Sequence, residues 1–396
     1  MKKFYYLIVA LFAFSFSGFA QPSKLQLKGD QFLQREQFDE AREYLQSLDE
    51  ATKESDPLYN YYMGMVYYYT PELKIDALPY INAYLESADS AQIEDYGHFH
   101  MYQLKAKMLH LKYRFDEAIP AYEKFIQVVR FSPSIPDNGK NTIIKEAQRD
   151  IEHCKFAKVA ITNPRNVVIE SLGDSINSKY PEYAAVVSQD EKQLIFTSRR
   201  PDTRGGKLAK EGGGFYEDIY AAELKTGSLF DHKNRKSDEV RGAFFNLVTE
   251  FEYGNFQQLS KEVNSNDHDG SIQLDKKDEI LYFYRDGNIW KINLKAEIEE
   301  EAKAEQLGVN VNSDYHEPSL FFSYDESKLF IVSDRPGGYG GLDIYVSEKL
   351  ENDEWSPAKN LGPEINTEFD EDAPYFDPDG QTLYFSSKGH SSIGGG

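Results

Sequence analysis

Hydrophobic residues recur every three or four positions along the first part of the chain, from about residue 24 to residue 160. In the stretch "KGDQFLQREQFDEAREYLQSL", this spacing places Phe32, Ala41 and Leu45 on one face. Such a period is typical of amphipathic helices. After about residue 165 the pattern changes to short alternating runs separated by Gly, Pro and Asp turns, which indicates β-strands. The sequence therefore predicts a helical domain at residues 21–160 and a strand domain at residues 165–396.

The helical segment contains three similar stretches: "QFDEAREYL" at 37–45, "KIDALPYINAYL" at 74–85 and "RFDEAIPAYEKFI" at 114–126. Each has an alanine at the same place, and a second small residue precedes that alanine by 12 or 13 positions. The six positions are Gly29 and Ala41, Gly64 and Ala77, and Ala106 and Ala118. Small side chains let two helices cross closely, so we predict three stacked helical hairpins and a capping helix at 141–160. The alternative is an irregular helical bundle.

Six tyrosines crowd the first helix of the second hairpin: Tyr59, Tyr61, Tyr62, Tyr67, Tyr68 and Tyr69. One helix face cannot bury all of them, so we expect some to face solvent or a concave groove that could hold a peptide. For any single tyrosine, packing is the favoured interpretation over ligand contact.

The strand segment repeats more strictly, in four stretches that align without a gap. Each stretch begins with Asn followed by Ser or Thr and has an acidic residue five positions later. The asparagines are Asn177, Asn264, Asn312 and Asn366, and the acids are Glu182, Asp269, Glu317 and Glu371. We expect each acid to accept hydrogen bonds from backbone amides or from a side chain of a neighbouring repeat, which would fix the repeats together.

Each repeat predicts a strand, a tight turn, a second strand, a glycine loop and a third strand such as "LDIY", which contains Asp343. Four short antiparallel strands in about 45–50 residues are typical of a β-propeller blade. The predicted fold class is thus a multidomain α + β chain, in which a tetratricopeptide-like solenoid precedes an incomplete all-β propeller of about three and a half to four blades. The wide gap between Asn177 and Asn264 is interpreted as one blade with insertions; the alternative is an extra degenerate blade.

Three motifs carry a resemblance to a known group of proteins: "WSPAKNLGPEINT", "DEDAPYFDPDGQTLYFSS" and "DRPGGYGGLDIY". They resemble the WD-repeat-like, TolB-like (PD40-like) propeller repeats of exported bacterial proteins. Preceded by tetratricopeptide-like hairpins, they resemble Bacteroidetes envelope proteins of the OmpA family, including the PorE-type component of type IX secretion. Those relatives continue into a peptidoglycan-binding domain. Because the last repeat stops within its glycine loop, we expect this chain to be truncated at its C-terminus.

The resemblance implies a non-enzymatic scaffold in the periplasm, associated with the outer membrane. Its implied partners are other envelope or secretion-system proteins, bound through the helical groove and the propeller face, and peptidoglycan through the missing domain. The alternative is the propeller of a prolyl-oligopeptidase-type exported serine hydrolase whose catalytic domain lies outside this chain.

Composition supports export and limits the partners. Lys2 and Lys3 precede a short apolar run that ends near small Gly18 and Ala20, which predicts a signal peptide at residues 1–20; an uncleaved anchor is the alternative. No later run is long and apolar enough to predict a transmembrane span.

A formal charge of −22 disfavours nucleic acid and anionic lipid as partners. The single cysteine, Cys154, excludes an internal disulfide and reads as a buried structural thiol.

No motif indicates catalysis, so we predict no catalytic residue, no cofactor and no metal site. The segment "GHSSIG" at 389–394 only loosely resembles a nucleophile elbow, and a glycine loop is favoured. The segment "NSNDHDG" at 264–270 resembles a calcium loop but lacks its distal glutamate, and an architectural role is favoured. His268 and His316 share one register position in different repeats, which indicates a repeat feature and not a metal pair.

Overall fold

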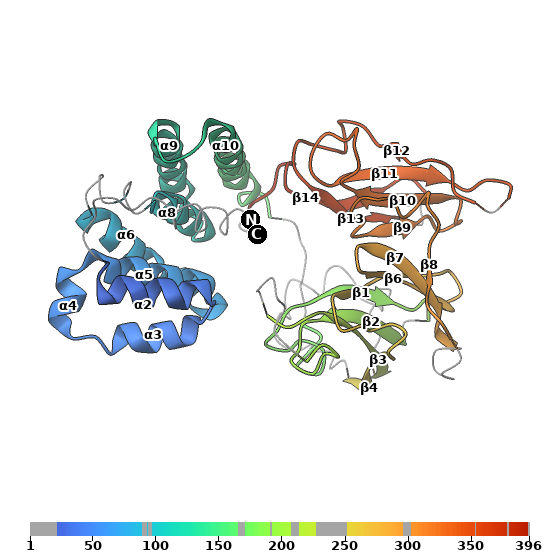
Figure 1. Cartoon of the computed structure of the whole chain (residues 1–396). Coiled ribbons are helices and arrows are strands. Elements are labelled where there is room, and N and C mark those ends of the chain that lie inside the picture. Colours follow the sequence, from blue (N-terminus) through green and yellow to red (C-terminus); the bar gives the residue numbers. More distant parts are fainter. Residues whose placement is uncertain are drawn as a thin grey trace. The chain divides into compact units, whose positions relative to one another are not determined.

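The computed structural model describes residues 22–88, 93, 97–164, 171–190, 192–206, 214–226, 252–295, 302–352, 354–377 and 380–394. The chain divides into two compact units, a helical unit (residues 1–165 with 391–396) and a strand unit (residues 166–390). Figure 1 labels the helices and strands of both units. The predicted signal peptide lies outside the described residues, as does much of the predicted insertion in the first strand repeat.

The helical unit is built from consecutive short helices that pack on their chain neighbours. Their bounds are α2 Lys24–Gln34, α3 Phe38–Gln46, α4 Glu50–Ser55, α5 Pro57–Tyr69, the 3₁₀ turn η2 Pro71–Asp76, α6 Leu78–Ser87, α8 His100–Leu111, α9 Phe115–Phe131 and α10 Asp137–Ala160. Side chains cap the N-termini of α2 and α5. The Ser23 side chain accepts from the backbone N–H of Gln26, and Asp56 does the same for Leu58 immediately before Pro57.

The small residues singled out in the sequence lie where these helices approach closely. A β-carbon on Gly29 of α2 would lie 2.5 Å from Cε1 of Tyr62 on α5. One on Gly64 of α5 would lie 3.2 Å from Cγ1 of Ile81 on α6. The four alanines are almost fully buried: Ala41, Ala77, Ala106 and Ala118. Gly29 of the first hairpin therefore admits a ring from the second hairpin.

The tyrosines of α5 divide between core and surface. Tyr61 and Tyr62 are buried, and the Tyr62 hydroxyl donates to the backbone O of Gln26 and to Oδ1 of Asp30. Tyr69 is 41% exposed. Cys154 on α10 is fully buried, and burial raises the pKa of its thiol to about 12. Within the described part of the chain, no helix combines the length and the apolarity needed to cross a bilayer.

The strand unit consists of four antiparallel sheets whose strands follow chain order. The first sheet holds β1 Glu182–Val187, β2 Gln193–Ser198, β3 Asp218–Thr226 and β4 Glu252–Gln258; the second holds β5 Asp269–Leu274, β6 Ile280–Arg285, β7 Asn288–Asn293 and β8 Glu305–Gln306; the third holds β9 Leu320–Phe322, β10 Lys328–Ser333, β11 Asp343–Glu348 and β12 Lys359–Asn360; and the fourth holds β13 Glu371–Phe376 and β14 Leu383–Ser387.

The fold class predicted from the sequence is wrong. The strands form four small separate antiparallel sheets, and the described residues form no closed barrel and no propeller after the helical part. Alternation of polar and apolar residues and the spacing of turns determine how each hairpin pairs. Closure of a ring depends on contacts between the first and last sheets, which no local pattern contains.

Apolar side chains pack between successive sheets. Ile219 of β3 and Phe283 of β6 belong to one cluster shared by the first two sheets. Ile289 of β7 and Leu329 of β10 belong to a second cluster, between sheets two and three. In the third cluster, Ile344 of β11 packs with residues of the last sheet. Each sheet therefore depends on its neighbour for part of its core.

Candidate functional site

The repeated asparagine joins each sheet to the one before it. Oδ1 of Asn312 accepts from the backbone N–H of Ile289 on β7 (2.7 Å), and its Nδ2 donates to the O of Ile289 (3.0 Å) and of Leu307 (2.9 Å). Asn264 binds Ile219 of β3 in the same way, and Asn366 binds Ile344 of β11. We call this contact the asparagine clamp.

Among the described residues, no sheet precedes the first asparagine. Asn177 is exposed, and its Oδ1 accepts from the backbone N–H of Leu172 and the hydroxyl of Ser171, both in its own preceding loop. The clamp therefore has a direction, because each sheet reaches back to its predecessor along the chain.

The repeated acids bind within their own repeats; Asp269, Glu317 and Glu371 are buried, and Glu182 is half-buried. Glu317 accepts from the backbone N–H and hydroxyl of Ser313 (3.1 and 2.6 Å), from the Ser333 hydroxyl (2.7 Å) and from Nη2 of Arg335 (3.1 Å). Equivalent bonds to Ser or Thr four residues earlier are made by Glu182, Asp269 and Glu371. The sequence left two possible partners for each acid, a backbone amide or a side chain of a neighbouring repeat. The structure shows the backbone amide of the same repeat, and the asparagine makes the contact between repeats.

Asp343 begins β11 and holds the glycine loop that precedes this strand. Its Oδ2 accepts from the backbone N–H of Tyr339 (2.9 Å) and of Gly340 (3.3 Å). Asp218 occupies the same place in the first sheet and accepts from the N–H of Arg204 (2.7 Å). Both side chains are buried, and burial raises both pKa values, that of Asp218 to about 6.

The first strands of the four sheets surround a cavity of about 1040 Å³. In order, β1 contacts β5, β5 contacts β9, and β9 contacts β13. The wall combines side chains from these strands with aromatic rings from β6 and with residues of the strand-joining turns. All of these residues belong to the strand unit, so the cavity lies within one compact body.

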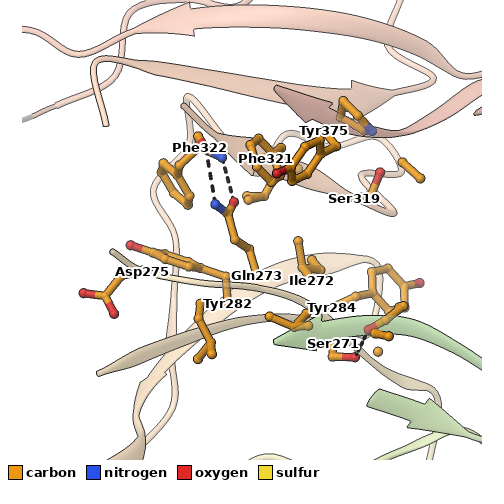
Figure 2. Close-up of a pocket in the computed structure, with 18 of the residues that line it drawn as sticks. Ser271, Ile272, Gln273, Asp275, Tyr282, Tyr284, Ser319, Phe321, Phe322 and Tyr375 are labelled. Atoms are coloured by element: carbon orange, nitrogen blue, oxygen red, sulfur yellow. Dashed lines mark hydrogen bonds between the residues drawn. The ribbon is translucent and has the colours of Figure 1, made fainter. Parts of the chain in front are cut away.

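Polar side chains tie the neighbouring first strands together where no backbone ladder joins them. The Ser271 hydroxyl on β5 donates to the backbone O of Ala184 on β1 (2.7 Å). The Gln273 amide accepts from the N–H of Phe322 on β9 (2.8 Å) and donates to its O (3.3 Å), the pair of dashed lines in Figure 2. The Ser319 hydroxyl donates to Oδ1 of Asp372 on β13 (2.6 Å). These bonds fix the shape of the wall.

Aromatic rings cover much of the cavity surface. The Phe321 and Tyr375 rings lie 4.9 Å apart and bring β9 and β13 together, and Tyr375 is 46% exposed. The Tyr282 and Phe322 rings lie 4.4 Å apart between the second and third sheets. In Figure 2 the Ile272 side chain lies between the strand that carries it and the rings of Phe321 and Tyr375. The surface thus offers stacking area beside polar groups.

Three of the first strands contain a bulge that faces the cavity. The pairing register shifts in β1, β5 and β13, and Ala184 and Ala373 adopt left-handed φ values of 51° and 50° at these points. A non-glycine residue in this region costs about 1–2 kcal/mol, and such strain is common where a strand shapes a binding surface. The equivalent positions in the other two repeats are the bridging serines Ser271 and Ser319.

Sequence reasoning missed these wall residues, although one signal was present. The residue seven positions after each repeated asparagine is small in all four repeats: Ala184, Ser271, Ser319 and Ala373. A small residue at a fixed register position indicates a close approach of neighbouring strands.

The remaining sequence candidates have structural contacts. His268 pairs with Glu217 and His316 packs against Tyr284; both histidines line the cavity, from different repeats. In the segment 264–270, Asn264 forms the asparagine clamp and Asp269 is one of the four repeated acids. Nε2 of His390 binds the backbone O of Ile365 (2.9 Å). In the part of the chain that the structure describes, no three His, Cys, Asp or Glu side chains are grouped to hold a metal.

Comparison with known proteins leaves the resemblance stated above as a prediction. No protein-family model matches the sequence, and no curated protein matches it.

Proposed function

We propose that the chain is a non-enzymatic, exported scaffold of the cell envelope that binds other proteins. The observation that carries this proposal is the cavity, a space of about 1040 Å³ lined by aromatic rings and held open by bonds between successive first strands. Aromatic and polar concave surfaces of this kind suit an inserted protein segment. The resemblance to envelope proteins adds the proposed location, the periplasm near the outer membrane, in an assembly such as type IX secretion.

The hydrogen bonding of the wall favours binding over chemistry. The hydroxyls of Ser271 and Ser319 both donate to acceptors on the neighbouring strand, at 2.7 and 2.6 Å. A serine nucleophile instead needs its hydroxyl directed at a general base beside an open substrate position. In this wall the two hydroxyls instead connect neighbouring strands by hydrogen bonds.

Site-specific crosslinking in the native cells tests the proposal. A photoreactive amino acid is placed at Ile272 in the cavity and, as a control, at Leu350, an exposed residue that does not line it. We expect a discrete protein adduct from position 272 and none from 350, and the same adduct should disappear when Tyr375→Arg removes the aromatic ring and places a positive charge in the wall. Equal labelling from both positions would contradict a binding role for the cavity.

Two further measurements address export and the enzymatic alternative. The mature N-terminus should lie near Gln21 if the signal peptide is removed. The recombinant chain should not turn over peptide or ester substrates, and turnover that is lost in Ser391→Ala would overturn the non-enzymatic proposal in favour of a serine hydrolase.

A further inference from the structure

We infer that the cavity binds a basic protein segment, an extended chain whose Lys or Arg side chains enter between the aromatic rings and the wall carboxylates. This inference rests on the proposed function, because it names the chemistry of the partner that the scaffold holds. The observations that carry it are the balance of charge in the wall and the position of that charge relative to exposed rings.

Half of the carboxylates that line the cavity already have a cationic partner. Asp269 pairs with Arg285 (2.9 Å), Glu217 with Arg199 (2.6 Å) and Glu326 with Lys276 (3.3 Å). Three further wall carboxylates have no ion-pair partner among the described residues: Asp275, Asp278 and Asp372. The described wall thus carries an uncompensated negative charge that a cationic ligand would neutralise.

The uncompensated carboxylates lie at two parts of the wall. Asp275 and Asp278 belong to the turn between β5 and β6, and Asp372 lies on β13. Burial, together with Asp190 and Asp275 nearby, raises the pKa of Asp278, while the backbone N–H of Gln189 opposes this shift. A cation beside this turn would relieve the repulsion between like charges.

Aromatic rings lie along the same wall. Tyr375 follows Asp372 on β13 and is 46% exposed over Phe321. Tyr282 lines the part of the cavity near the β5–β6 turn, and burial raises its pKa to about 12, so its ring is neutral at physiological pH. Neutral aromatic faces attract Lys and Arg side chains, and a neighbouring carboxylate strengthens this attraction.

The same features disfavour other ligands. An acidic segment would meet the three unpaired carboxylates, and the formal charge of −22 on the whole chain would oppose its approach. A bare metal ion needs several convergent ligands, and the described residues contain no such group. A cation carried on a flexible side chain satisfies both the rings and the carboxylates.

Matched peptides test the inference on the full mature chain. Three fluorescent nonapeptides, (Gly-Ser-Lys)₃, (Gly-Ser-Glu)₃ and (Gly-Ser-norleucine)₃, are titrated with protein, and binding is followed by anisotropy. We expect the lysine peptide to bind at least about tenfold more tightly than the norleucine peptide at low salt, with weaker binding as salt is added. The glutamate peptide should bind most weakly.

Five variants separate a cavity effect from the effect of total charge and test the contribution of the aromatic ring. Asp372→Asn and Asp278→Asn keep the acceptor oxygen that binds the wall, and each should weaken lysine-peptide binding about fivefold. Glu351→Gln removes one exposed charge that does not line the cavity and should leave binding unchanged. Tyr375→Phe keeps the ring and should retain binding, whereas Tyr375→Leu should lose it.

Equal loss in Glu351→Gln and Asp372→Asn would overturn the inference, because binding would then follow total charge. No preference for lysine over norleucine would also overturn it. If a protein adduct still forms from position 272 in that case, the scaffold proposal stands and only the basic chemistry of the partner fails.

Discussion

The helical unit and the strand unit hold their repeated elements together by different means. In the helical unit, small residues such as Gly29 and Ala106 let apolar surfaces meet, and the contact depends on shape. In the strand unit, Asn312 and its equivalents bind the backbone of the preceding sheet, and the contact depends on paired polar groups. The first type is sensitive to added volume, whereas the second is sensitive to a lost partner.

The chain provides a spectroscopic signal for one unit alone. Both tryptophans, Trp290 and Trp355, lie in the strand unit. Tryptophan fluorescence therefore follows unfolding of the sheets, and far-ultraviolet circular dichroism is dominated by the helices. The two signals allow each substitution below to be assigned to its own unit.

The largest effect is expected from Asn312→Ala. This change leaves the backbone N–H and O of Ile289 without the side chain that binds them inside the protein, and each unsatisfied buried group costs about 1–3 kcal/mol. We expect the free energy of unfolding of the strand unit to fall by about 3–5 kcal/mol, measured by tryptophan fluorescence in urea.

Asn177→Ala is the matched control for that prediction. Asn177 is exposed, and its side-chain partners among the described residues lie in its own loop, so its loss should cost less than about 1 kcal/mol. Similar losses for Asn177→Ala and Asn312→Ala would show that the clamp between sheets contributes nothing beyond local loop structure.

The second effect is a stabilisation that depends on pH. Burial raises the folded-state pKa of Asp218 from its ordinary value of 3.8 to about 6, so the folded state binds this proton more tightly than the unfolded state. The free energy of unfolding therefore falls as pH rises from about 4 to about 6. Asp218→Asn keeps an acceptor for Arg204 and removes the charge.

We expect Asp218→Asn to raise the free energy of unfolding by up to about 3 kcal/mol above pH 7, with the difference vanishing towards pH 4. Urea unfolding by tryptophan fluorescence at several pH values measures this change. A variant that is less stable than the parent at pH 8 would mean that the Asp218 charge is compensated in the fold.

The third effect concerns shape in the helical unit. Gly29→Ala places a methyl group 2.5 Å from the Tyr62 ring, which is buried and held by two hydrogen bonds. Overpacking of about 1–3 kcal/mol exceeds the gain of about 1 kcal/mol in helix propensity. We expect a loss of about 1–2 kcal/mol in circular dichroism melts, with the tryptophan transition unchanged.

The smallest effect is expected from the same substitution in the next hairpin. In Gly64→Ala the new methyl group lies 3.2 Å from Cγ1 of Ile81 and 3.4 Å from the terminal methyl group of Met101, and a shift of a few tenths of an ångström relieves both contacts. The gain in helix propensity then offsets the strain, and the free energy of unfolding should change by less than about 1 kcal/mol. A loss of unfolding free energy larger than that of Gly29→Ala would mean that the helices pack more tightly at Gly64 than at Gly29.

The sequence identified the residues of the asparagine clamp but not the bonds they make. A fixed register shows that Asn312 and Glu317 have repeated roles, and both are buried in hydrogen bonds. Which of the two reaches the neighbouring sheet depends on the path of the chain between sheets. That path is set by tertiary packing, so the sequence left the partner of the acid open and did not predict that the asparagine makes the contact between sheets.

The cavity and the arrangement of the sheets were less accessible to sequence reasoning. Gln273 lies on a polar position of an ordinary strand, and its bonds to Phe322 join residues 49 positions apart. Local alternation could predict the β5–β6 hairpin but not this contact. The predicted propeller was wrong for the same reason, since ring closure is the most distant contact of all.

The one-way asparagine clamp has a consequence for the order of assembly. Asn177 is satisfied by its own loop, so its hydrogen bonds need no residue of a later repeat. Asn264 needs β3, Asn312 needs β7 and Asn366 needs β11, each already made when its asparagine emerges. A chain that is synthesised from its N-terminus can thus bind each new sheet to one whose residues have already been made.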